Sequence, residues 1–267
     1  MNQPNKGYYT LTTGNDPQGR DAFGEYHQQG RYIYGVAVGI LILQTNTPMA
    51  PGNMSNASSF NFPVLFEGLG DIDPHLLVSE APDPVVIEKS IAAARRLQNQ
   101  GVRTIVGNCG FFASCQQQIA AKLQVPFFSS SLMQVSQVAN GLRPDQKVGI
   151  ITANGAALRA SPALQSCGLV DPSRAVIVGI EDTPPMQNVL TLKGHYSLQE
   201  MEQVLIDTAL TMVHEHPEIG AFVLECSELS IHAHAIQDAV RLNVWDFTTL
   251  VSWMQAGCVR KPFSGWI

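Results

Sequence analysis

Two cysteines, Cys109 and Cys226, stand where the sequence could support acid–base chemistry. Cys109 follows the strand-like residues Thr-Ile-Val-Gly-Asn and precedes a pattern typical of an amphipathic helix. Cys226 lies 117 residues later, between the apolar stretch Ala-Phe-Val-Leu-Glu and a second helical pattern. A thiol at the start of a helix lies among unpaired backbone N–H groups, whose positive field lowers the thiol pKa and can hold an anion. The pair therefore predicts a two-thiol active site.

Such a site suits removal of a proton from the carbon next to a carboxylate. Negative charge then develops on the carboxylate, and we expect N–H groups to stabilise it, from Gly110, Phe111, Ser227 and Glu228. We also expect Asn108, the neighbour of the first thiol, to contact the substrate. A thiol whose usual pKa of about 8.5 is lowered by the same N–H groups is a suitable base near neutral pH. A racemase needs one such group on each face of the carbon, whereas a lyase needs only one strong base.

Strand and helix patterns alternate along the chain and must position the two thiols. Residues 36–43 form an apolar run without alternation, which predicts a parallel strand buried on both faces. Gln44, Thr45 and Asn46 follow at its carboxyl end, where open α/β sheets bind ligands, so we expect them to line the site. Further strands are predicted at 62–66, 125–128, 148–152, 175–180 and 221–225. Helices are predicted at 83–100 with Asp83 as N-cap, from Cys109 to about 123, at 156–166 and at 198–214.

An internal repeat relates the two halves of the chain. Residues 123–132 resemble residues 242–251, and each segment reads as a strand followed by hydroxyl residues that cap a helix. The first copy begins 14 residues after Cys109 and the second 16 residues after Cys226. A repeated strand–helix alternation predicts two pseudo-symmetric parallel-sheet α/β lobes. If the lobes face each other across a cleft, the two thiols meet there.

Composition excludes several classes of protein. The net charge is −6 and no cluster of Lys and Arg is present, so we expect no nucleic-acid partner. The longest apolar run, residues 33–43, has 11 residues and is too short to span a membrane. The first thirty residues lack the apolar core of a signal peptide, which favours a cytoplasmic location. The five cysteines include no CxxC, so neither a disulfide framework nor a metal site is expected. Cys115, Cys167 and Cys258 are interpreted as small buried hydrophobes.

The paired strand–Cys–helix turns, the repeat and the length resemble the aspartate/glutamate/hydantoin racemase superfamily. The resemblance is strongest at Gly107-Asn-Cys and at Cys226-Ser-Glu-Leu. It implies cofactor-independent chemistry, a homo-oligomer and two crossings between lobes. The lobes would then be residues 30–133 plus 250–267, and residues 134–249, with residues 1–29 as a tail or flap. Two motifs of the amino-acid racemases are altered, because Gly-Phe-Phe follows Cys109 and Gln-Thr-Asn ends the first strand. Free aspartate and glutamate are therefore not the expected substrates.

These features predict a racemase or epimerase that moves a proton next to the carboxylate, or a hydantoin-like carbonyl, of a small substrate, since both thiols are present. A lyase or decarboxylase of the same superfamily, such as a dimethylsulfoniopropionate lyase, is the alternative. A non-catalytic two-lobe binding protein is a third possibility, although it has no need for a thiol at each strand end. A nucleotide-binding oxidoreductase would need GxGxxG after the first strand, and the sequence there does not supply it.

Overall fold

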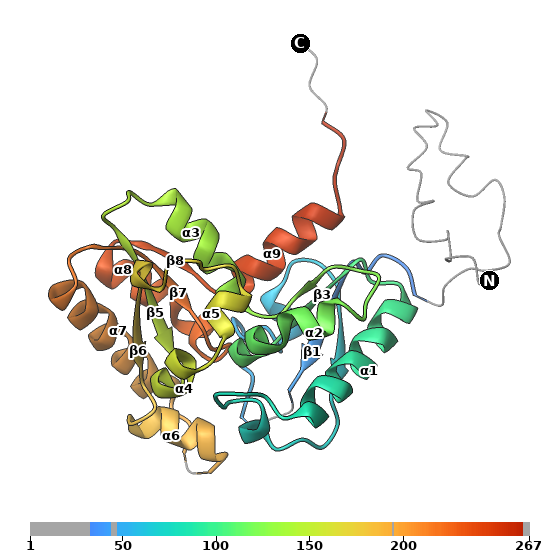
Figure 1. The fold of residues 1–267 in the computed structure, drawn as a ribbon, viewed down its shortest axis with the longest axis horizontal. Helices are drawn as coiled ribbons and strands as arrows, with labels where there is room; N and C mark the ends of the chain where they lie inside the picture. The colour runs from blue at the N-terminus through green and yellow to red at the C-terminus, as the bar shows by residue number, and fades with distance from the viewer. Residues whose placement is uncertain (1–32, 44–46, 194, 264–267) are drawn as a thin grey trace, which may run out of the picture.

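The computed structural model describes residues 33–43, 47–193 and 195–263, which form two α/β lobes side by side (Figure 1). The first sheet has the strand order β2-β1-β3-β4, from β1 (Val38–Ile42), β2 (Val64–Gly68), β3 (Thr104–Gly107) and β4 (Phe127–Phe128). The second has the order β6-β5-β7-β8, from β5 (Lys147–Thr152), β6 (Ala175–Gly179), β7 (Ile219–Leu224) and β8 (Asn243–Trp245). Neighbouring strands pair in parallel in both sheets. The two orders are the same topology, which confirms the predicted pair of pseudo-symmetric lobes.

Helices cover both sheets. The long helices α1 (Pro84–Gln100) and α7 (Leu198–Glu215) lie on the outer sides of the first and second lobe (Figure 1). The others are α2 (Gln116–Ala120), α3 (Val135–Gly141), α4 (Gly155–Ala160), α5 (Ala163–Ser166), α6 (Pro184–Thr191), α8 (Ala233–Val240) and α9 (Phe247–Cys258).

Helix α1 shows how local signals set an element's limits. The Asp83 side chain accepts a hydrogen bond from the N–H of Val85, and Pro84 occupies the first helical position, where its missing N–H costs nothing. The helix ends at Gly101, whose φ of 100° is accessible to glycine without strain. Its apolar face, which includes Ala94 and Leu97, packs against the first sheet. The predicted limits of this helix are confirmed.

Two predicted helices are wrong in detail. After Cys109 the chain forms the 3-10 helix η4 (Gly110–Cys115) before α2, and the N–H of Phe112 bonds to the Cys109 carbonyl at 3.1 Å. The single helix predicted at 156–166 is two helices, α4 and α5, separated at Ser161 and Pro162. Proline lacks an N–H and restricts the residue before it, so the hydrogen-bond ladder breaks there.

The repeat predicted at 123–132 and 242–251 is present, with a difference in its caps. In the first copy the hydroxyl of Ser130 accepts from the N–H of Leu132 and starts a 3-10 turn. In the second copy the carboxylate of Asp246 caps α9 and forms a capping box with Thr249. A carboxylate therefore replaces the expected hydroxyl as the cap of α9.

The two lobes pack on each other through a shared hydrophobic core. Phe111 and Phe112 of η4 belong to the same buried cluster as Val148 and Ile150 of β5. The hydroxyl of Ser131 donates to the carbonyl of Leu224 at 2.7 Å. Helix α9 returns to the first sheet, where its apolar residues join Val38, Ile40 and Val106 in one cluster. The residue limits given above for the two lobes stay a prediction.

Candidate active site

Cys109 and Cys226 occupy equivalent places in the two lobes. Cys109 follows β3 and begins η4, whereas Cys226 follows β7 and precedes the 3-10 helix η7 (Leu229–His232). In each sheet the strand before the cysteine pairs with the strand that begins the lobe, Gly107 with Leu41 and Leu224 with Ile151. Both cysteines are partly exposed. Gly110, the residue after Cys109, lies against the carboxyl of Glu225, the residue before Cys226. The fold thus brings the turns that carry the two thiols together.

Cys226 has a carboxylate partner within its own turn. Its thiol donates to Glu228 Oε2 at 3.0 Å, and the hydroxyl of Ser227 donates to the same oxygen at 3.0 Å. Glu228 is 6% exposed and Ser227 4% exposed, so the contact is shielded from bulk water. The arrangement makes Glu228 the natural acceptor for the thiol proton.

The expected lowering of the thiol pKa values is wrong. Burial raises the pKa of Cys226 well above its usual range, and the negative charges of Glu228 and Glu225 raise it further. Burial and Glu225 likewise raise the pKa of Cys109, although a hydrogen bond from the Phe111 N–H acts in the opposite direction. Backbone N–H groups are present as predicted, but desolvation and two carboxyl groups outweigh them. The raised pKa values keep both thiols protonated at neutral pH.

The second carboxyl group, Glu225, is a residue that sequence reasoning missed. It is 1% exposed, and its Oε2 accepts from the Thr152 hydroxyl at 2.8 Å and from the Ala153 N–H at 3.2 Å. Its other oxygen, Oε1, lies so close to Gly110 that a Cβ at that position would overlap it. Burial raises the pKa of Glu225 from its usual 4.5 to about 7. A charged residue ending an otherwise apolar strand, directly before a candidate cysteine, was the signal available in the sequence.

Glu225 has a counterpart in the first lobe, which is Asn108. Each is the residue before a cysteine, and each accepts from the backbone N–H that follows the central strand. Asn108 Oδ1 accepts from Leu43 at 2.8 Å, as Glu225 Oε2 accepts from Ala153. The Asn108 amide also donates to the Ser55 hydroxyl at 3.0 Å. Asn108 is 5% exposed, so it positions the loops around Cys109.

The other predicted site residues fall into three groups. Gly110 and Glu228 lie beside a thiol, as described above, and Ser227 orients Glu228. Phe111 buries its ring in the shared core, so only its N–H reaches Cys109. Gln44, Thr45 and Asn46 lie outside the described residues.

Tyr196 is a second residue that sequence reasoning missed. Its hydroxyl is buried and has no hydrogen-bond partner among the described residues. Burial raises the pKa of Tyr196, and the negative charges of Glu228 and Cys226 raise it further, so the hydroxyl stays protonated. Its side chain lines a small hollow of about 80 Å³, together with Lys193 of the same lobe and Thr47 and Pro48 of the first lobe. Nothing in its polar loop distinguishes this tyrosine in the sequence.

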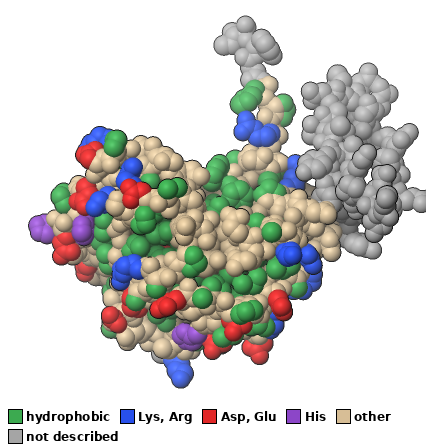
Figure 2. Space-filling view, viewed as in Figure 1, with side chains coloured by type: hydrophobic (Ala, Val, Ile, Leu, Met, Phe, Trp, Pro, Cys, Tyr) green, Lys and Arg blue, Asp and Glu red, His purple; other side chains and the backbone are tan. Residues whose placement is uncertain are grey.

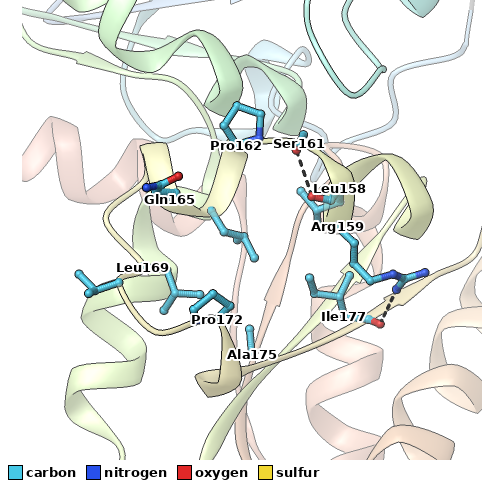
Figure 3. Close-up of a pocket in the computed structure, with 11 residues that line it drawn as sticks. Leu158, Arg159, Ser161, Pro162, Gln165, Leu169, Pro172, Ala175 and Ile177 are labelled. Carbon is cyan, nitrogen blue, oxygen red and sulfur yellow. Dashed lines mark hydrogen bonds between the residues drawn. The ribbon is translucent and has the colours of Figure 1, made fainter.

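A larger hollow of about 680 Å³ lies elsewhere on the second lobe. Hydrophobic side chains gather on this face (Figure 2), and the hollow is lined by residues of α4, α5 and β6 such as Leu158, Gln165 and Ile177 (Figure 3). The guanidinium of Arg159 at its edge donates to the Ile177 carbonyl at 3.1 Å. The lining residues include neither a thiol nor a carboxylate, so this hollow lacks the acid–base groups of the candidate site.

Within the described ranges, no group of three or more His, Cys, Asp or Glu side chains is arranged to hold a metal ion. Across the same ranges, every helix is too short or too polar to cross a membrane.

Solved structures define the class of fold. Allantoin racemase from Klebsiella pneumoniae matches with a TM-score of 0.59 at 18% identity, over 83% of this chain and 86% of that one. Arylmalonate decarboxylase matches with a TM-score of 0.52 at 16% identity, over 85% and 94%. An aspartate racemase homologue from Pyrococcus horikoshii gives 0.51 at 14% identity, over 82% and 99%. The chain therefore has the fold of the aspartate/glutamate/hydantoin racemase superfamily, which confirms the resemblance at the level of the fold.

The curated proteins that are similar to this chain in sequence are dimethylsulfoniopropionate lyases. Dimethylsulfoniopropionate lyase 6 of Emiliania huxleyi is 32% identical over 237 residues, which are 86% of this chain and 61% of the lyase. Dimethylsulfoniopropionate lyase 3 of the same organism has the same identity and coverage over 238 residues. The lyase of Durusdinium sp. clade D is 24% identical over 87% of this chain and 78% of its own. The chain thus spans 61% of the first two relatives. No protein-family model matches it.

Proposed function

We propose that this chain is a carbon–sulfur lyase that eliminates dimethyl sulfide from a small β-sulfonium carboxylate such as dimethylsulfoniopropionate. The observation that carries the proposal is the contact between Cys226 and Glu228, in a chain whose curated relatives are dimethylsulfoniopropionate lyases. A thiol that already donates to a carboxylate is equipped to lose its proton and act as a base.

The reaction begins when the Cys226 thiol passes its proton to Glu228. The resulting thiolate takes a proton from the carbon next to the substrate carboxylate. The electron pair of that C–H bond forms a carbon–carbon double bond, and the carbon–sulfur bond breaks with its electron pair leaving on dimethyl sulfide. The products are acrylate and dimethyl sulfide, with one proton on Cys226 and one on Glu228. Release of the Glu228 proton to water restores the resting site.

Two other groups bind the substrate in this scheme. The hydroxyl of Tyr196, which has no partner among the described residues, donates to the substrate carboxylate, because the raised pKa of this tyrosine keeps its proton in place. Cys109, from the first lobe, orients the substrate in this scheme, since an elimination needs a base on one face only. Its own proton is held by burial and by the charge of Glu225, both of which raise its pKa.

The test is incubation of the purified protein with dimethylsulfoniopropionate. Dimethyl sulfide is measured by gas chromatography and acrylate by NMR. We expect both products in equal amounts, with loss of nearly all activity in Cys226→Ser and a fall of about 10²- to 10⁴-fold in Glu228→Gln. Cys258→Ser is the matched control, because Cys258 ends α9 and belongs to neither turn. Product formation that survives Cys226→Ser would exclude the proposed base.

A racemase is the second candidate, favoured by the presence of a thiol in each lobe. It would exchange the proton on both faces, with Cys109 and Cys226 as the two acid–base groups. Incubation of chiral α-substituted carboxylates and hydantoins in D₂O would then give deuterium at the α-carbon together with loss of optical purity. That outcome, without dimethyl sulfide release, would replace the lyase proposal.

A further inference from the structure

The structural task of Glu225 does not need a charge. Its counterpart Asn108 accepts the equivalent backbone hydrogen bond with a neutral amide, and the two lobes are otherwise alike in topology. Both residues also donate their own N–H to the equivalent strand, Asn108 to Leu41 and Glu225 to Ile151. The first lobe thus serves as an internal control for the second. The turn therefore does not need the ionisable carboxyl of Glu225 for its support, and the charge must have another role.

Among the residues that the structure describes, no cation compensates the charge of Glu225. No salt bridge reaches Glu225 or Glu228 in the part of the chain that the structure describes. Oε2 is held by Thr152 and Ala153, whereas no donor from the described residues reaches Oε1, which lies against Gly110 beside Cys109. Glu228 adds a second carboxyl to the same site. Two carboxyl groups without a cation form a site that a positively charged group would complete.

We propose that Glu225 recognises the positive charge of the substrate's leaving group, so that the site selects carboxylates that carry an onium group. This proposal rests on the proposed function and adds that Glu225 binds the positive charge of the substrate's onium group. The onium charge, once bound, offsets the two carboxyl charges that disfavour a thiolate. The same interaction therefore binds the substrate and makes the thiol proton easier to remove. A neutral substrate of the same shape would gain neither effect.

Two non-reacting analogues isolate the charge. 3-(Trimethylammonio)propionate and 4,4-dimethylpentanoate share a carboxylate, a two-carbon spacer and a head group of three methyls, and differ only in having N⁺ or carbon at its centre. Their dissociation constants are measured by calorimetry at pH 8 with the full chain. We expect the cationic analogue to bind at least about tenfold more tightly than the neutral one, because the charged contact is shielded from water.

Glu225→Gln is expected to remove most of this preference, since an amide keeps the hydrogen bonds and loses the charge. Glu218→Gln is the matched control, because Glu218 directly precedes β7 and Glu225 directly follows it. The control should keep the full preference. Equal binding of the two analogues by the unaltered protein, or an unchanged preference in Glu225→Gln, would overturn the proposal.

The outcomes also separate this proposal from the reaction itself. Release of dimethyl sulfide with no charge preference in binding would support the lyase activity and overturn the proposed role of Glu225. A charge preference that depends on Glu225, without release of dimethyl sulfide, would support the recognition of the onium charge and overturn the proposed lyase activity.

If Glu225→Gln does not fold, the unaltered protein is compared at pH 6 and pH 8. Glu228, Cys109 and Cys226 are the titratable groups coupled to Glu225, and the raised pKa values of the thiols keep them protonated in this range. The preference should grow as Glu225 ionises. A preference that does not change between the two pH values would overturn the proposal.

Discussion

Replacing Glu225 by glutamine should change the pH dependence of stability as well as binding. Burial raises the pKa of this carboxyl from its usual 4.5 to about 7, so between these values the folded protein holds a proton that the unfolded chain has lost. Stability therefore falls as pH rises from 4.5 to 7 and is level above that range. The difference in pKa, at about 1.4 kcal/mol for each pH unit, amounts to about 3 kcal/mol.

Glutamine resembles the protonated carboxyl and carries no such pH dependence. We therefore expect Glu225→Gln to have nearly the stability of the unaltered protein at pH 4.5 and to be about 3 kcal/mol more stable at pH 8. Urea unfolding at a series of pH values measures the difference directly. Glu67→Gln is the control, since Glu67 pairs with Arg96 at 2.7 Å on the surface and should show no such trend. A difference between Glu225→Gln and the unaltered protein that stays constant with pH would refute the reasoning.

Three further predictions concern the same site. Gly110→Ala places a Cβ on the Glu225 carboxyl and should lower the free energy of unfolding in urea by about 1–3 kcal/mol. In the double variant, Glu225→Ala should recover part of that loss. Purely additive losses would show that the two residues do not touch. Tyr196→Phe removes a buried hydroxyl that has no hydrogen-bond partner among the described residues. Thermal unfolding should therefore show equal or higher stability, by about 1 kcal/mol, while KM rises. An unchanged KM would contradict the role of Tyr196 in binding. Glu228→Gln removes a charge that raises the pKa of Cys226. Alkylation of the Cys226 thiol by iodoacetamide at pH 8 should therefore become faster, which mass spectrometry measures. A slower reaction would contradict the electrostatic account.

The sequence contained enough local information to predict much of the fold. The limits of α1 follow from Asp83, Pro84 and Gly101, which act within one turn of the helix ends. The positions of Cys109 and Cys226 after equivalent strands followed from apolar runs and the internal repeat. These features depend on residues that are neighbours in the chain, so the hydrophobic pattern and the capping residues are enough to predict them.

The electrostatics of the site could not be predicted in the same way. Gly110 and Glu225 come from different lobes, and their contact exists only after the two sheets have packed together. An argument from the helix starts counts the N–H groups beside each cysteine and omits burial, which is the main cause of the raised pKa of both thiols and exists only after packing. For Cys109 it also omits Glu225, a carboxyl from the other lobe. For Cys226 the two carboxyls, Glu228 and Glu225, are its neighbours in the sequence. The predicted direction of the thiol pKa shift is therefore wrong, although both thiols follow the strands predicted to carry them.

The difference between Asn108 and Glu225 has a stereochemical consequence. A cleft with perfect twofold symmetry would accept a small substrate in two orientations and could not distinguish the two hydrogens on its prochiral α-carbon. A carboxyl in one lobe and an amide at the equivalent position of the other break that symmetry, so the charged end of the substrate is expected to have one preferred direction. Only one of the two enantiotopic hydrogens then faces Cys226. An elimination on this scaffold is expected to remove that hydrogen alone, even though the acrylate it produces has no stereocentre.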